Sequence, residues 1–290
     1  MIEITNVTVG YEDAAGVPAL ADLSAVFPDQ KLTVIIGPNG SGKSTLLRTI
    51  MRFLPVTSGT IRHNGIELSE MSERDIARKT AYLPQSRPIP QIRVKEMVLH
   101  GRFPYLSFPR QYSQHDRDIV KQSLREADAA ELEKQYMNEI SGGQRQKVYI
   151  AMALAQQTKN ILMDEPTTYL DIRHQFQTMR LLKKIAQDGR CAAVVLHDLG
   201  MAFAFADQLI VLEHGKIRMQ DTPDEVYTAG IIPEIFGVEL VKTVENNMES
   251  NMENNVGKNA ETNVGHIGKA FYYTREITSS FCSSKNISPS

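Results

Sequence analysis

The sequence predicts an α/β fold built on a parallel sheet whose strands alternate with helices. Four uninterrupted apolar stretches have the length and composition of buried strands: LTVIIG (32–37), TAYLPQ (80–85), NILMDEP (160–166) and CAAVVLHD (191–198). Stretches with helical periodicity separate them, which is the order typical of βαβ units. The chain has 290 residues, of which 42% are hydrophobic, enough for a large core in one or two domains.

Other β-patterned segments lie outside this sheet. Residues 2–9 place isoleucine and valine at intervals typical of a strand, and Asn64-Gly65 in TIRHNGIEL (60–68) predicts a hairpin. We expect these segments to form an antiparallel β subdomain beside the parallel sheet.

A helical subdomain is predicted as an insertion at about residues 86–157. The stretch DIVKQSLREADAAELEKQ (118–135) is its clearest amphipathic part. A later helix is expected at Thr222, because Pro223 in the first turn and Glu225 three residues on complete the pattern of a capping box.

The C-terminal part differs in character from the rest. From about residue 245 the chain is rich in asparagine and poor in apolar residues, which predicts disorder, and KAFYYTREI (269–277) predicts a short strand. We therefore expect a main domain at 2–240 and a partly disordered C-terminal extension at 241–290.

Composition narrows the class of protein. The net charge is -2, from 32 basic and 34 acidic residues, which argues against a nucleic-acid partner bound through an overall cationic field. Cys191 and Cys282 are far apart and lack metal-ligand spacing, so we expect neither a disulfide framework nor a zinc site. The chain starts without the pattern of a signal peptide and holds no apolar window that spans a bilayer. We expect a cytoplasmic chain that reaches the membrane only through a partner.

The stretch VIIGPNGSGKSTLL (34–47) contains the pattern G-x-x-x-x-G-K-[ST] of P-loop NTPases. The residues of this loop are Gly37, Pro38, Asn39, Gly40, Ser41, Gly42, Lys43 and Ser44. Glycines let backbone N–H groups turn inward around a phosphate, and the following helix adds its positive end. Lys43 is predicted to contact the β- and γ-phosphates, Ser44 to bind Mg²⁺ and Thr45 to add a phosphate contact. An accidental glycine-rich turn is the alternative, which the position between an apolar strand and an apolar helix disfavours.

Polar residues follow three of the other predicted strands. Asp164 and Glu165 end the strand at 160–166, where Asp164 can hold Mg²⁺ and Glu165 can accept a proton from an attacking water. His197 closes the last strand and can contact the γ-phosphate, and Gln85 can meet Mg²⁺ or the water. Taken alone, such acids are usually solvated and such a histidine is usually structural.

The segment ISGGQRQKVYIAMALAQ (140–156) predicts a second phosphate-binding helix end. Ser141 can cap the helix, Gly142 and Gly143 allow close backbone approach to a ligand, and Gln144 follows. A glycine loop that merely links two helices is the alternative.

SGGQ, 23 residues before Asp164, resembles the signature of the ATP-binding cassette (ABC) ATPases, and the resemblance covers about residues 2–240. It implies a P-loop NTPase core that binds ATP and Mg²⁺. It also implies that Tyr11 stacks on adenine, that Gln85 is the Q-loop glutamine, that residues 168–172 (TYLDI) are the D-loop and that His197 is the switch histidine. Ile140 stands where the family usually has leucine, a swap that conserves volume.

The resemblance also implies partners. In that family two cassettes close head to tail, with each ATP between one P-loop and the SGGQ of the other copy, so a homodimer is expected. Transmembrane permease subunits would dock near Gln85, an external substrate-binding protein would act through them, and the chain would sit peripherally at the cytoplasmic face of the cell membrane.

Three segments are similar to cassettes that energise import of iron-siderophores, haem and vitamin B12: MVLHGRFPYLS (97–107), SGGQRQKVYIAMALAQ (141–156) and EPTTYLDI (165–172). Tyr105 replaces the histidine that those subunits often carry. The alternatives are a zinc or manganese importer, an exporter, and a soluble ABC ATPase of DNA repair or translation. A P-loop kinase would leave SGGQ unexplained.

The predicted site therefore has three overlapping groups. The catalytic candidates are Glu165, His197, Gln85 and Lys43, and the metal ligands are Ser44, Gln85 and Asp164. The nucleotide-binding candidates are Tyr11, residues 37–45 and residues 141–144. Five further histidines form no ligand set in the sequence, and we interpret them as surface or packing residues: His63, His100, His115, His174 and His214.

Overall fold

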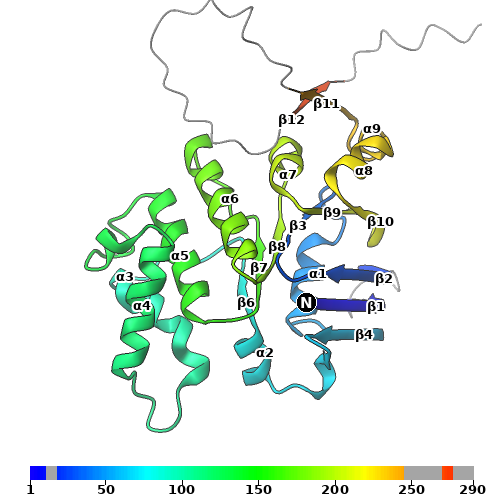
Figure 1. Cartoon of the computed structure of the whole chain (residues 1–290). Helices are drawn as coiled ribbons and strands as arrows, with labels where there is room; N and C mark the ends of the chain where they lie inside the picture. Colours follow the sequence, from blue (N-terminus) through cyan, green and yellow to red (C-terminus); the bar gives the residue numbers. More distant parts are fainter. Residues whose placement is uncertain (11–17, 245–269, 277–290) are drawn as a thin grey trace, which may run out of the picture.

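The computed structural model describes residues 1–10, 18–244 and 270–276. A six-stranded sheet lies at the centre, with an antiparallel sheet on one side and a group of helices on the other (Figure 1). Strand β3 shows how the core is divided. Leu32, Val34 and Ile36 face one hydrophobic cluster, which contains the helical region, whereas Ile35 faces the other. Alternate residues of a strand point to opposite faces, so a strand covered on both sides must be apolar throughout.

The central sheet contains all four strands predicted from apolar stretches. Its order is β10-β9-β3-β8-β7-β6, and every neighbouring pair is parallel except β9 and β10. The strands are β3 (Leu32–Ile36), β6 (Thr80–Leu83), β7 (Asn160–Asp164), β8 (Cys191–Val195), β9 (Gln208–Glu213) and β10 (Lys216–Asp221). The predicted α/β class with an antiparallel β subdomain is confirmed.

The antiparallel sheet has the order β2-β1-β4-β5. Its strands are β1 (Ile2–Val9), β2 (Leu20–Phe27), β4 (Ser58–His63) and β5 (Ile66–Glu67). The hairpin predicted at Asn64-Gly65 joins β4 to β5, and both turn residues have positive φ, 52° and 81°. Those angles suit a two-residue turn that matches the right-handed twist of the strands.

Helices cover both faces of the central sheet and form the group beyond β6 (Figure 1). The α-helices are α1 (Lys43–Ile50), α2 (Glu73–Lys79), α3 (Val94–Leu99), α4 (Gln114–Glu126), α5 (Gly142–Ala155), α6 (Ile172–Gln187), α7 (Leu199–Phe205), α8 (Pro223–Thr228) and α9 (Ile231–Phe236). Short 3-10 helices are η1 (Leu68–Glu70), η2 (His100–Tyr105) and η3 (Ala130–Leu132). In the described part of the chain no helix is both long and apolar enough to cross a bilayer.

One local prediction about helices needs correction, and one is given its detail by the structure. Within the amphipathic stretch 118–135, α4 ends at Glu126 and Asp128 takes a positive φ of 52° before η3 begins. The capping box at Thr222 is one-sided. Its hydroxyl accepts the N–H of Glu225, but its own N–H donates to Asp221 Oδ1 at 2.7 Å.

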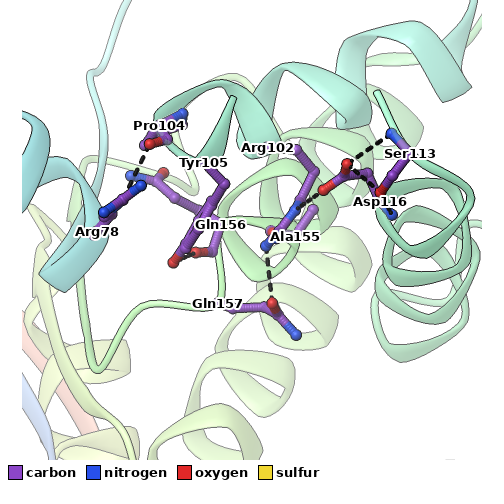
Figure 2. A network of polar contacts seen from close by, with 9 residues as sticks. All are labelled: Arg78, Arg102, Pro104, Tyr105, Ser113, Asp116, Ala155, Gln156 and Gln157. Atoms are coloured by element: carbon purple, nitrogen blue, oxygen red, sulfur yellow. Dashed lines mark hydrogen bonds and ion pairs between the residues drawn. The ribbon is translucent and has the colours of Figure 1, made fainter. Parts of the chain in front are cut away.

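Arg102 of the segment GRFPY in η2 is packed inward (Figure 2), whereas Phe103 of the same segment is exposed. The Arg102 guanidinium is 5% exposed and forms an ion pair with Asp116 of α4, with Nε 2.9 Å from Oδ1. Its Nη1 donates to Ala155 O at the end of α5 and to Gln157 Oε1, at 2.9 and 2.8 Å. Arg78 of α2 donates to Pro104 O at 3.1 Å. These contacts tie the helical group together and join it to α2 beside the sheet.

A second hairpin pairs β11 (Val238–Val244) with β12 (Ala270–Glu276) in antiparallel register, which confirms the short strand predicted near the C-terminus. Tyr272 lies against Phe203 of α7, with ring centroids 5.2 Å apart, and its hydroxyl donates to Asp224 Oδ1. The asparagine-rich segment that predicts disorder lies outside the described residues.

Candidate functional site

The predicted site residues gather where parallel strands end. The phosphate-binding loop follows β3, Gln85 comes two residues after β6, Asp164 ends β7 and His197 comes two residues after β8. Asp164 is level with Val195 of β8, and Val195 is level with Ile35 of β3. Carboxyl ends of neighbouring parallel strands therefore place these groups at one edge, where open α/β sheets bind ligands.

Glycines shape the phosphate-binding loop at points where a side chain has no room. A β-carbon on Gly37 would lie 2.1 Å from the carbonyl oxygen of Leu212, and Gly42 has a φ of 102°. Asn39 and Gly40 are exposed at the tip of the loop. Gly42 precedes α1 without any side-chain cap, so no capping side chain competes with a ligand at the start of the helix.

Lys43 is held over this loop. Its side chain is buried, and Nζ donates to the carbonyl oxygens of Gly37 and Pro38, both at 2.8 Å. Burial lowers the pKa of Lys43, and the carboxylates of Glu165 and Asp164 oppose that shift. A buried cation beside the uncapped N-terminus of a helix suits a polyphosphate.

Asp164 and Ser44 offer oxygen ligands for a cation. Asp164 is 4% exposed, and its Oδ1 has no hydrogen-bond partner. Burial raises the pKa of Asp164, while a hydrogen bond from the Ser44 hydroxyl opposes that shift. The described residues contain no group of three or more His, Cys, Asp or Glu able to hold a metal. One carboxylate and one hydroxyl fit Mg²⁺, which is usually completed by phosphate oxygens and water.

Glu165 is the centre of a polar cluster. Its side chain is 9% exposed, its φ is 48°, and it contacts His197 through Oε1. Its Oε2 accepts from Gln85 Nε2 and from the Thr168 hydroxyl, the latter at 3.1 Å. The structure thus brings together three residues that the sequence placed in separate segments, 80 and 32 positions from Glu165.

Thr168 is the member of this cluster that the sequence did not single out. It entered only as the first residue of the D-loop, although its spacing of three residues from Glu165 permits a contact within one turn. Tyr11, predicted to stack on adenine, lies outside the described residues. Thr45 lies in the first turn of α1, as the predicted phosphate contact requires.

The SGGQ segment lies elsewhere, at the start of α5. Ser141 Oγ accepts the N–H of Gln144 at 3.3 Å, and Gln144 Oε1 accepts the N–H of Ser141 at 2.9 Å. Helix α5 packs on β6, which is three strand spacings, about 14 Å, from β3. Figure 1 shows α1 and α5 on different sides of the sheet, and the two helices belong to different hydrophobic clusters. The two predicted phosphate-binding ends therefore form no common site within one chain.

A model of the ABC transporter family matches residues 20–168, which contain the phosphate-binding loop, Gln85, SGGQ, Asp164 and Glu165. The chain belongs to the ABC transporter family. The resemblance predicted from the motifs, and with it the P-loop NTPase core, is confirmed.

Curated relatives of this ABC cassette match over most of their own length. The iron(3+)-hydroxamate import ATP-binding protein FhuC of Bacillus subtilis (strain 168) is 41% identical over 233 residues, 80% of this chain and 86% of that protein. The ferric enterobactin transport ATP-binding protein FepC of Escherichia coli (strain K12) is 39% identical over 236 residues, with the same shares. The dimeric structure of MJ0796, a bacterial ABC transporter cassette, has a TM-score of 0.67 at 30% identity and covers 77% of this chain and 99% of that one.

Proposed function

We propose that this chain is the ATP-binding and ATP-hydrolysing subunit of an ABC importer, which energises uptake of an iron-siderophore, haem or cobalamin through partner permease subunits. The observation that carries the ATPase proposal is the cluster of Gln85, Thr168 and His197 around Glu165, next to the phosphate-binding loop. Two relatives are named as an iron(3+)-hydroxamate import ATP-binding protein and a ferric enterobactin transport ATP-binding protein. These names support an iron-siderophore as the cargo.

The residues have the following parts in the proposed hydrolysis. Lys43 and the N–H groups at the start of α1 bind the phosphates of ATP, and Asp164 and Ser44 hold Mg²⁺. When bound, Mg²⁺ neutralises charge on the phosphate oxygens. Glu165 accepts a proton from the attacking water. At the same time the water oxygen bonds to the γ-phosphorus, and the bond from the γ-phosphorus to the ADP oxygen breaks. Gln85 and His197 orient Glu165 and the water.

A second copy of the chain completes each ATP site. The start of α5 and the phosphate-binding loop lie apart in one chain, so SGGQ can bind the γ-phosphate only from another copy. A twofold homodimer satisfies this arrangement twice with one gene product, and the dimeric neighbour supports it. Loss of the γ-phosphate then removes the contact that holds the copies together.

Permease subunits are proposed to dock beside the Gln85 loop. Ile89 just after this loop is 48% exposed, and Phe103 and Phe108 at and after η2 are 52% and 97% exposed. Aromatic side chains such as Phe103 and Phe108 are enriched in protein–protein interfaces, which favours a protein partner on this part of the chain. Docking there would hold the chain peripherally at the cytoplasmic face of the membrane, with an external binding protein delivering cargo to the permease.

Substitution of Glu165 tests the proposed ATPase. Glu165→Gln keeps the shape of the side chain but cannot accept a proton as a carboxylate does, so hydrolysis should fall at least 100-fold while ATP binding persists and ATP-bound dimers accumulate. Glu131→Gln, an exposed acid in η3, is the matched control and should hydrolyse ATP at the wild-type rate. Unchanged hydrolysis in Glu165→Gln would refute the role of Glu165. Uptake of labelled ferric siderophore, haem or cobalamin by the reconstituted complex tests the cargo class.

A further inference from the structure

The second glycine of SGGQ is covered from inside its own chain by a histidine. A β-carbon built on Gly143 would lie 2.3 Å from Cδ2 and 2.6 Å from Cγ of His174, closer than real β-carbons come to other atoms. A β-carbon on Gly142 would meet no atom of the described residues within 4 Å. Gly143 is buried and Gly142 is exposed. The imidazole therefore requires the glycine at 143, whereas Gly142 is free to face a ligand.

Asp171 of the D-loop holds the imidazole of His174 in place. Asp171 caps α6, and its Oδ1 accepts the N–H of His174 at 3.0 Å. Its Oδ2 is 2.7 Å from His174 Nδ1. One carboxylate thus fixes both the backbone and the ring of His174, so the ring orientation follows the position of the D-loop.

The same loop also reaches the catalytic candidate Glu165. Thr168, the first D-loop residue, donates its hydroxyl to Glu165 Oε2 at 3.1 Å. The D-loop therefore contacts Glu165 at its start, through Thr168, and holds His174 against Gly143 further along, through Asp171. The D-loop backbone from Thr168 to Asp171 thus links the ATP site of one copy to the surface that would bind the ATP of the other copy.

The first turn of α5 needs such support. Two successive glycines at the start of a helix have no side chains to pack, and each loses more conformational freedom on ordering than any other residue. The capping box between Ser141 and Gln144 satisfies N–H groups but leaves the inner face of the turn uncovered. The ring of His174 fills that face.

We propose that His174 is a positioning residue that fixes Gly143, and with it the N–H groups at the start of α5, in the geometry that binds the γ-phosphate of ATP held by a second copy. This proposal rests on the proposed function of the chain. It assigns a role to a histidine that the sequence analysis placed among surface or packing residues.

Two substitutions separate the ring of His174 from its hydrogen bond. His174→Asn keeps a polar group that can reach Asp171 but removes the ring from Gly143. His174→Phe keeps a ring over Gly143 and loses the hydrogen bond. The exposed His115 of α4 provides the matched control His115→Asn. A groove of about 210 Å³ already borders the ring, next to Lys147 and Leu181, so loss of the ring enlarges an open space rather than creating a sealed void.

The assay is ATP-driven dimerisation of the full chain in the Glu165→Gln background, followed by light scattering as ATP is raised. His174→Asn should raise the ATP concentration at half-dimerisation about tenfold, while His174→Phe and His115→Asn stay within about threefold of the parent. Binding of a fluorescent ATP analogue to the monomer should be unchanged in all variants, because the phosphate-binding loop is untouched. A merely structural role would lower thermal stability without separating these two readouts.

The outcomes distinguish this proposal from the proposed function. If the Glu165→Gln parent does not dimerise with ATP, the head-to-tail scheme itself fails. If the parent dimerises and His174→Asn matches it, or His174→Phe is impaired as strongly as His174→Asn, the positioning role of the ring is refuted. A double-mutant cycle on thermal stability tests the contact independently, since Gly143→Ala should cost less stability in a His174→Ala background than alone. Additive costs would contradict the contact.

Discussion

Replacing Arg102 by methionine tests whether the buried network of Figure 2 stabilises the fold. Methionine keeps most of the apolar stem but removes the cation that faces Asp116, whose side chain is 10% exposed. Removing one partner of a buried ion pair leaves the other charge buried and unpaired, which lowers the free energy of unfolding by about 3–5 kcal/mol. Asp116 keeps hydrogen bonds from Ser113 N and Oγ, at 2.9 and 2.7 Å, which places the expected loss near 3 kcal/mol.

Thermal unfolding measures this loss. At about 2–4 °C per kcal/mol for a chain of this order of size, Arg102→Met should melt about 6–12 °C below the wild type. Arg218→Met is the control, because Arg218 is 41% exposed and its pairs with Glu213 and Glu234 are worth no more than about 1 kcal/mol.

The double variant Arg102→Met/Asp116→Asn separates the effect of an unpaired buried charge from the effect of lost packing. Asparagine at 116 can still accept from Ser113 but carries no charge, so the double variant should regain about half of the lost melting temperature. A melting temperature of Arg102→Met within 2 °C of the wild type would refute the reasoning. A double variant no more stable than the single one would show that packing dominates.

Two further predictions concern pH and the C-terminal hairpin. Burial lowers the pKa of His63 to about 4, so the neutral ring stabilises the fold above pH 6.5 and this contribution is lost as the pH falls towards 4. Urea unfolding should show about 2 kcal/mol more loss of stability between pH 7 and pH 5 in the wild type than in His63→Gln, and equal losses would contradict the burial effect. Truncation after residue 244 removes β12 and uncovers Phe203, so the melting temperature should fall. The ATPase rate per folded molecule should stay within tenfold of the full chain, and a larger loss would show that β12 acts on the site.

Several elements could be predicted from the sequence because their causes are local. The strands at 32–36 and 160–164 are buried at every position, so they are mostly apolar and stand out in the chain. The phosphate-binding loop needs glycines at given positions to avoid clashes with its own and neighbouring backbone, so its spacing is visible without a fold. The end of α4 has no clear signal in the sequence, because the turn at Asp128 interrupts a stretch that stays amphipathic on both sides.

The sequence by itself determined the family, the strand and loop that bind phosphate, and the residue types gathered around Glu165. Only the tertiary structure decided that His174 lies on Gly143, that Arg102 pairs with Asp116, and that Tyr272 lies against α7. The physical reason is that composition and periodicity determine which face of an element is apolar or polar. Which residue meets which across two elements depends on how the elements cross and pack, and that is set by the whole chain.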